Sequence, residues 1–325
     1  MKAGIKGTGM YVPPKVLSNN DLVAMGLDTN DEWIQTKTGM KLRHIVEGDV
    51  CTSDLAAEAG KAALADAGVK PEDVDMVILA TSSPDVRLSS TAARVQAKIC
   101  CYNSGAFDVN SVCSGFVYAF DIGSRMVLDP YLENVLVIGA EVYSKILNWK
   151  DRTTCVYFGD GSGAALLQKT EVGGVLGSYL KADGRGAEVI EIPAGGTKMP
   201  MTKDILGSGL EYFHMDGRAV WDFATVKFPE AVREIVKRVG YTVDDIDWVI
   251  PHQSNVNMIR VGMDKLGLPV EKAYQNLEKY ANCAGASIPI ALHEAAKDGS
   301  LNKGDLVVTC GYGGGLSWGC NAIIW

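Results

Sequence analysis

The chain has 325 residues, of which 47% are hydrophobic, and a formal net charge of −8. This composition predicts a globular protein with a large core, and the acidic balance argues against nucleic acid or an anionic membrane as a primary partner. No apolar run approaches the roughly 18 residues that span a bilayer, and the N-terminus lacks the apolar stretch of a signal peptide. We therefore expect a cytoplasmic protein. The eight cysteines are expected as free thiols, and the four histidines have no metal-site spacing, so we expect no metal.

In chain order, apolar strands alternate with amphipathic helices. A helix is predicted over residues 54–68, from apolar residues at helical spacing, and a buried strand over 76–80. A short strand at 106–109 runs into an apolar helix that begins near Cys113. The stretch 183–216 is rich in Gly, Pro and Met and is the least repetitive part of the chain. We interpret it as an inserted loop region near a substrate entrance, and a plain surface loop is an equal alternative.

Internal repetition predicts the architecture. VKPEDVDMVILA at 69–80 is echoed by YTVDDIDWVIPH at 241–252, 172 residues later, and ENVLVIGAE at 133–141 is echoed by GDLVVTCGY at 304–312. The continuous apolar runs in these strands are typical of sheets covered by helices on both faces. The sequence therefore predicts a duplicated, layered α/β/α/β/α fold. We divide it into an N-terminal half, residues 1–172, and a C-terminal half, 173–325, with 183–216 inserted in the second.

Cys113 lies at the junction of a strand and a helix, in the stretch AFDVNSVCSGFVYAF. A thiol at a helix N-terminus feels the positive end of the helix dipole, which favours the reactive thiolate. Ser114 and Gly115 add almost no bulk, so a substrate can approach closely. A buried structural cysteine is the alternative for any isolated Cys.

The repeat places two further polar residues near Cys113. Adding 172 to its number gives Gly285, inside NCAGASIP at 282–289, so Asn282 lies at the matching junction of the second half. His252 directly follows the strand DWVI, at a strand C-terminus where α/β sheets usually carry their sites. The run GYGGGLSWG at 311–319 supplies backbone N–H groups of the kind that form an oxyanion hole, although a tight turn alone is equally possible.

Together these residues carry a resemblance to a known family. The chain resembles the thiolase superfamily, and within it the β-ketoacyl-acyl-carrier-protein synthase III family of initiating condensing enzymes, over essentially its whole length. The matching stretches are GTGMYVPPKVLSN (7–19), TNDEWIQTKTGMKLRH (29–44), DVNSVCSGF (108–116), FGDGSGAALL (158–167), PHQSN (251–255), NCAGASIPIAL (282–292) and GYGGGLSWG (311–319).

The resemblance implies a mechanism and a set of site residues. It implies that Cys113 is acylated by an acyl-CoA, with an oxyanion hole formed by the N–H groups of Cys113 and Gly314. It further implies that His252 and Asn282 assist a decarboxylative condensation with malonyl-acyl carrier protein, giving a 3-oxoacyl product that starts fatty acid synthesis. It implies a homodimer, with no cofactor beyond these thioester substrates. The positions that match the family's substrate-binding residues are Trp33, Lys37, Leu88, Arg152, Gly217, Trp221 and Asn255.

Several of these positions depart from the family pattern. Leu88 and Trp221 stand where Phe is usual, and Lys37 stands where a phosphate-binding Arg is common. These departures leave the chemistry intact but leave the acyl primer open. The alternative function is a same-fold acyltransferase or polyketide-type starter synthase that uses a non-acetyl primer or a CoA-bound extender. A non-catalytic scaffold is a third possibility, against which the retention of Cys113, His252 and Asn282 argues.

Overall fold

The structure, a computed structural model, describes residues 1–325 and contains two large mixed sheets. The strands of the first sheet, in spatial order, are β1 (Lys2–Tyr11), β7 (Gly161–Thr170), β6 (Val135–Glu141), β4 (Met76–Ala80) and β5 (Gly105–Val109). Those of the second are β8 (Gly174–Ala182), β13 (Ser317–Ile324), β12 (Leu306–Gly313) and β11 (Trp248–Pro251).

The two sheets share one pattern of strand directions. In the first sheet β1, β7 and β6 are antiparallel to their neighbours, and β4 then pairs parallel with β6. In the second sheet β8, β13 and β12 are antiparallel in the same way, and β11 pairs parallel with β12. The parallel strand β5 extends the first sheet. At the corresponding edge of the second, Ala273 forms an isolated parallel bridge with Val249. The matched strand order agrees with the duplication inferred from the sequence.

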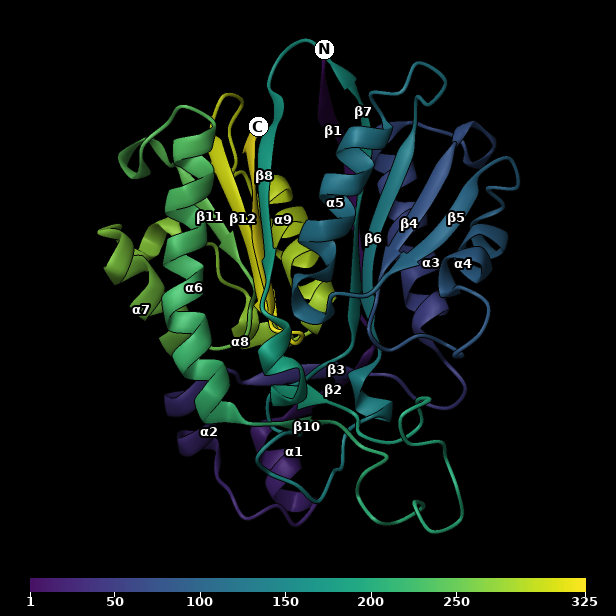
Figure 1. The fold of residues 1–325 in the computed structure, drawn as a ribbon, viewed down its shortest axis with the longest axis vertical. Helices are drawn as coiled ribbons and strands as arrows, with labels where there is room; N and C mark the ends of the chain where they lie inside the picture. The colour runs from purple at the N-terminus through teal and green to yellow at the C-terminus, as the bar shows by residue number, and fades with distance from the viewer.

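Helices fill three layers around the two sheets (Figure 1). The helices α5 (Gly115–Met126) and α9 (Ser287–Lys297) lie between the sheets and pack against both. The outer face of the first sheet is covered by α3 (Thr52–Ala67) and α4 (Thr91–Ile99), and that of the second by α6 (Gly217–Arg238) with α7 (Val256–Leu266). The predicted α/β/α/β/α layering is therefore confirmed. No helix combines the length and apolar character needed to cross a membrane.

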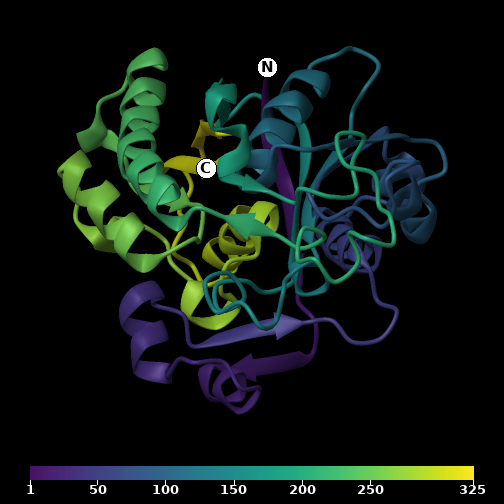
Figure 2. The ribbon, with the colours of Figure 1, turned by 60° about the horizontal axis from the view of Figure 1, so that its bottom comes forward.

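Shorter elements gather at one end of the molecule. Figure 2 shows the purple N-terminal segment and the teal-to-green region 183–216 there. The elements are β2 (Lys15–Ser18), α1 (Asn19–Ala24), α2 (Asp31–Thr38), β3 (Leu42–Ile45), β9 (Ile190–Glu191), β10 (His214–Met215) and α8 (Leu277–Tyr280). The proposed boundary near residue 172 falls in the short turn between β7 and β8. The division into two halves stays a prediction, because the central helices pack against both sheets.

Equivalent strained turns introduce the two central helices. A 3₁₀ turn at Val112–Ser114 precedes α5, and another at Ala284–Ala286 precedes α9. Val112 has φ 46° and Ala284 has φ 40°, in the left-handed region that non-glycine residues rarely adopt. Such backbone strain is held by the surrounding structure and clusters at functional sites. The two turns contact one another, so the duplication brings the Cys113 junction and the Asn282 junction together.

Candidate active site

A largely apolar cavity of about 180 Å³ lies where these two junctions meet. Six of the predicted site residues line it: Cys113, Gly217, Trp221, His252, Asn255 and Asn282. The remaining lining residues are Tyr157, Phe158, Ile190, Phe213, Met215, Val220, Ser254, Met258, Tyr312 and Gly313. An apolar cleft with a few convergent polar groups is the usual form of a small-molecule site.

Cys113 is held by its own turn and by the glycine run of β12. Its thiol belongs to the 3₁₀ turn that precedes α5 and is buried. A Cβ added to Gly313 would come within 2.7 Å of the Cβ of Cys113 and within 3.1 Å of its Sγ. Glycine is therefore required there for β12 to approach the thiol. The Oγ atoms of Ser114 and Ser317 are 2.8 Å apart and join the start of α5 to β13.

The electrostatic setting of Cys113 differs from the expectation. Burial raises the pKa of the Cys113 thiol well above its usual range, and the nearby negative charge of Glu141 acts in the same direction. The helix dipole was expected to lower this pKa, but desolvation outweighs it. The resting cysteine is therefore a neutral thiol.

His252 directly follows β11 and is fixed through its backbone and its ring. Its N–H donates to the Cys310 carbonyl at 2.7 Å, and Nδ1 lies 2.7 Å from Ser287 Oγ. Burial lowers the pKa of His252 to about 3, so the imidazole is neutral near pH 7. Ser287 Oγ already accepts the Gln253 N–H at 3.3 Å, which leaves its hydroxyl proton free to donate to Nδ1. In that tautomer Nε2 carries the proton and is available as a donor.

Asn282 presents a second neutral donor. Its Oδ1 accepts the N–H of Ala284 at 2.8 Å, and its own N–H donates to the Tyr157 carbonyl at 2.9 Å. Because the carbonyl oxygen of the amide is occupied by the backbone, the NH₂ group remains for the cavity that Asn282 lines. Two neutral hydrogen-bond donors thus line the same cavity as the thiol.

Gly314, the other predicted oxyanion-hole residue, is not itself among the cavity-lining residues, whereas its neighbour Gly313 is. A Cβ at Gly314 would lie 3.1 Å from Val112 Cγ2 and 3.4 Å from Ile190, so the glycine packs against the turn that carries Cys113. Its carbonyl accepts the Ser317 hydroxyl at 2.6 Å. The role of its N–H stays a prediction.

Of the seven predicted substrate-binding residues, Gly217, Trp221 and Asn255 line the cavity, and the other four lie outside its lining. Arg152 lies over the ring of Trp33 with its guanidinium carbon 5.7 Å from the centroid, which is a cation–π arrangement. Asn255 caps α7 and its side chain donates to the carbonyl of Lys37 at 2.9 Å. Leu88 is 89% exposed, on the loop between β4 and α4, and does not line the cavity of its own chain.

Three residues of the site were missed by sequence reasoning: Ser287, Glu141 and Tyr143. Ser287 lies within the motif NCAGASIP, but no spacing rule connects it to His252. Glu141 ends the apolar strand β6 and is fully buried. The sequence signal that could have identified Glu141 is a charged residue at the end of the otherwise apolar run VLVIGAE. Burial raises the pKa of Glu141 to about 7, although the hydrogen bonds from Ser82 and Ser83 oppose that shift.

The comparisons with known proteins agree with this geometry. Residues 107–184 match the family model described as 3-oxoacyl-[acyl-carrier-protein (ACP)] synthase III, and residues 236–325 match its C-terminal model. The chain is 48% identical to a β-ketoacyl-[acyl-carrier-protein] synthase III of Caldanaerobacter subterraneus subsp. tengcongensis, covering 99% of this chain and 98% of that protein. It is 44% identical to the enzyme of that name from Symbiobacterium thermophilum, again covering 99% and 98%.

Solved structures give the same result. The crystal structure of 3-oxoacyl-[acyl-carrier-protein] synthase III from Aquifex aeolicus VF5 superimposes with a TM-score of 0.91 at 40% identity, covering 99% of this chain and all of that one. The aligned region spans nearly the whole chain, so it contains both sheets and both junctions of the site. The chain therefore belongs to the β-ketoacyl-acyl-carrier-protein synthase III family of the thiolase superfamily.

Proposed function

We propose that this protein catalyses the initiating condensation of fatty acid synthesis, with Cys113 as nucleophile and His252 and Asn282 as hydrogen-bond donors. The observation that carries the proposal is the convergence of one thiol and two neutral donors on a single apolar cavity. A neutral donor pair suits the stabilisation of a developing enolate, and a buried thiol suits a covalent acyl intermediate.

In the first step Cys113 attacks the carbonyl of an acyl-CoA, and its thiol proton ends on the sulfur of the departing CoA. The tetrahedral oxyanion is stabilised by the N–H groups of Cys113 and Gly314, and CoA leaves as its thiol after taking up a proton. The acyl group remains on Cys113 as a thioester. Because burial raises the pKa of this thiol, proton transfer accompanies the attack instead of preceding it.

In the second step a malonyl thioester loses CO₂. The electron pair of the broken C–C bond forms an enolate, whose oxygen accepts hydrogen bonds from His252 Nε2 and Asn282 Nδ2. The enolate carbon attacks the acyl carbonyl, a C–C bond forms, and the Cys113 thiolate leaves. Decarboxylation supplies the carbanion, so no strong base, metal or other cofactor is required.

We assign the predicted binding residues to successive parts of the CoA thioester. Trp33 and Arg152 would hold the adenine of CoA, and Lys37 its phosphates. Gly217, Trp221 and Asn255 line the cavity and would contact the pantetheine arm shared by CoA and the carrier protein. Gly217 is the first residue of α6, where the absence of a side chain leaves room for the arm.

We further propose a cytoplasmic homodimer in which the partner's Leu88 helps to close the acyl site. The loop that carries Leu88 is firmly anchored on both sides. Asp85 accepts the N–H of Ser53 at 2.9 Å, and its own N–H donates to Thr91 Oγ1 at 3.1 Å. Leu88 thus presents an exposed apolar side chain from a fixed loop, which the partner subunit would cover.

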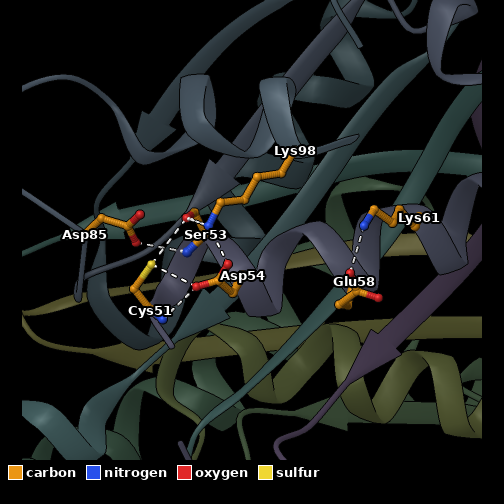
Figure 3. A network of polar contacts seen from close by, with 7 residues as sticks. All are labelled: Cys51, Ser53, Asp54, Glu58, Lys61, Asp85 and Lys98. Carbon is orange, nitrogen blue, oxygen red and sulfur yellow. Dashed lines mark hydrogen bonds and ion pairs between the residues drawn. The ribbon is translucent and has the colours of Figure 1, made fainter. Parts of the chain in front are cut away.

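The start of α3 braces this loop, as Figure 3 shows. Asp54 accepts the backbone N–H of Cys51 at 2.9 Å and pairs with Lys98 of α4. Lys98 also donates to Ser53 Oγ at 2.7 Å. These contacts join α3 to α4, the helix that follows the loop, so Leu88 is presented from a rigid base.

Acyl transfer to Cys113 tests the proposal directly. Purified protein incubated with acetyl-CoA should gain the mass of one acetyl group, and peptide mapping should place it on Cys113. Cys113→Ala should abolish loading, whereas Cys155→Ala, which changes a buried cysteine of the same apolar cluster, should not. Subsequent addition of malonyl-carrier protein should release the acyl group as a 3-oxoacyl product. Turnover with malonyl-CoA instead would favour the starter-synthase alternative, and acylation of another cysteine would contradict the mechanism.

A further inference from the structure

The turn that joins β12 to β13 carries Gly314, the second residue of the predicted oxyanion hole. The ladder between the two strands ends at the pair Gly313–Ser317, so Gly314 lies in the turn beyond it. Gly313, Gly314 and Gly315 follow one another here, and Gly315 has φ 122°. Glycine has more backbone freedom than any other residue. The orientation of the Gly314 N–H must therefore be fixed by contacts outside the ladder.

The hydroxyl of Ser317 supplies such a contact. It lies 2.6 Å from the Gly314 carbonyl oxygen and 3.3 Å from the Ser111 carbonyl oxygen, so its single proton is donated to Gly314. The outer end of the turn is anchored separately. The Leu316 N–H donates to the Asp183 carbonyl at 3.1 Å, and the Leu316 carbonyl accepts the Asp183 N–H at 2.8 Å. Removing the Ser317 hydroxyl would thus release Gly314 while these backbone contacts remain.

Two further hydroxyls connect Ser317 to the turn that carries Cys113. Ser317 Oγ lies 2.8 Å from Ser114 Oγ, which lies 3.0 Å from Ser111 Oγ. Because Ser317 gives its proton to Gly314, the Ser114 hydroxyl is the donor to Ser317, and the Ser111 hydroxyl is in turn free to donate to Ser114. The three serines thus form a hydroxyl chain that ends on the Gly314 carbonyl. Each buried hydroxyl in such a chain polarises the next and strengthens its hydrogen bond.

The hydroxyl chain joins the two segments that carry the N–H groups of the predicted oxyanion hole. Ser114 directly follows Cys113, and the chain ends on Gly314. The segments are in contact, since a Cβ added to Gly313 would lie 3.2 Å from the Cys113 nitrogen and one added to Gly314 would lie 3.1 Å from Val112 Cγ2. Oxyanion donors act most strongly when they are fixed in place before the reaction. A rotation of Gly314 would move its N–H away from the oxygen that it stabilises.

We propose that Ser317 is a positioning residue for acyl transfer, which holds the Gly314 N–H in place for the oxyanion through the hydroxyl chain. The proposal rests on the proposed function and adds a residue to its acyl-transfer step. Ser317 is not among the cavity-lining residues, so it acts through Gly314. Attack of Cys113 on an acyl carbonyl forms an oxyanion, whereas its exchange with a thiosulfonate forms none at carbon. Two reactions of the same thiol therefore distinguish the oxyanion hole from the nucleophile.

The test compares these two reactions in Ser317→Ala. Loss of a whole oxyanion donor costs about 100- to 1000-fold in kcat, and a displaced donor should cost less, so we expect acetyl loading of Cys113 at saturating acetyl-CoA to fall about 10- to 30-fold. The half-saturating acetyl-CoA concentration should change by less than about threefold. Methyl methanethiosulfonate transfers its methylthio group to the thiol, releases methanesulfinate and leaves the thiol proton in solvent. Its rate at Cys113, measured by peptide mapping, should stay within about threefold of wild type.

Three other variants complete the design. Ser317→Thr keeps the hydroxyl and should recover most of the loading rate. Ser114→Ala breaks the hydroxyl chain one member earlier and should also lower loading, so it replaces Ser317→Ala as the test variant if that protein does not fold. Thr309→Val is the matched control, because it removes a buried hydroxyl that donates to Asn321 Oδ1 at 3.0 Å across the same two strands. It should leave both reaction rates unchanged.

The outcomes separate the positioning role from the proposed function. Unchanged loading in both Ser317→Ala and Ser114→Ala would overturn the proposal, as would a loss that Ser317→Thr does not recover. Parallel losses of loading and of the thiosulfonate reaction would also overturn it, because the defect would then lie in the thiol. If wild-type protein reacts with the thiosulfonate at Cys113 but never gains an acetyl group, the proposed function itself fails. A loss confined to acyl loading, with recovery in Ser317→Thr, supports the assignment.

Discussion

Replacing Ser287 by alanine is expected to slow malonyl decarboxylation while leaving acyl loading nearly intact. The variant removes the hydroxyl that lies 2.7 Å from His252 Nδ1 and leaves a buried ring nitrogen without a partner. It also removes the acceptor of the Gln253 N–H. His252 then loses the contact that sets its tautomer and its orientation toward the developing enolate oxygen.

The size of this effect follows from the energetics of one buried hydrogen bond. Leaving a buried polar group unsatisfied costs about 1–3 kcal/mol, and about 1.4 kcal/mol corresponds to a factor of ten. As His252 donates to a more negative oxygen, Nδ1 becomes a stronger acceptor, so the lost hydrogen bond matters more in the transition state than in the ground state. We therefore expect a decrease in kcat of about tenfold, with KM for the malonyl substrate little changed.

The assay follows CO₂ release from malonyl-carrier protein and acetyl loading separately. Ser287→Thr, which keeps the hydroxyl, should recover most of the decarboxylation rate. Ser124→Ala is the matched control, because it removes a buried hydroxyl that donates to the Asp121 carbonyl at 2.8 Å on α5, away from the cavity. Equal losses in loading and decarboxylation, or no loss at all in Ser287→Ala, would refute the assignment of Ser287 as the positioning residue for His252.

Two further predictions concern Asn282 and Glu141. Asn282→Ala should retain acyl loading on Cys113 but lose about 100-fold or more in malonyl decarboxylation, the scale of one oxyanion donor, and unchanged CO₂ release would exclude its amide from the donor pair. For Glu141→Gln, urea unfolding should show the variant gaining stability relative to wild type as pH rises from 4.5 to about 7, by up to about 3 kcal/mol. The reason is that burial raises the pKa of Glu141 from 4.5 to about 7, so in this pH range the carboxyl of the unfolded chain ionises while that of the native protein keeps its proton, and the native protein loses stability. A pH-independent difference would contradict that shift.

Much of the fold could be predicted because its signals are local and repeated. Apolar runs at 76–80 and 248–251 coincide with β4 and β11, and the offset of 172 relates the Val112 turn to the Ala284 turn. Periodicity and repetition depend on the sequence of each element alone. The convergence of Cys113 and Asn282 then followed from the duplication.

Other properties depend on how the two halves pack, which no local pattern reports. The pKa of Cys113 is raised because the second half and the loop region bury the thiol, whereas the helix start alone predicts a lowered pKa. The partners of Tyr143 come from residues far apart in the chain, Ser82 and Phe213. Sequence spacing cannot pair such residues, so both these contacts and the electrostatics of the site had to come from the structure.

The contact between the two junctions also explains why the duplicated fold carries only one nucleophile. Gly285 occupies the position equivalent to Cys113, and a Cβ there would lie 3.1 Å from the Val112 carbonyl and 3.1 Å from Glu141 Oε1. A side chain at Gly285 would therefore press against the turn that holds Cys113 and against the buried carboxylate. Because the two turns face each other at close range, the position of Gly285 is crowded by the turn that carries Cys113. The second junction instead contributes Asn282, three residues before Gly285, which lines the cavity, so the crowding at Gly285 favours an asymmetric division into one thiol and a set of donors.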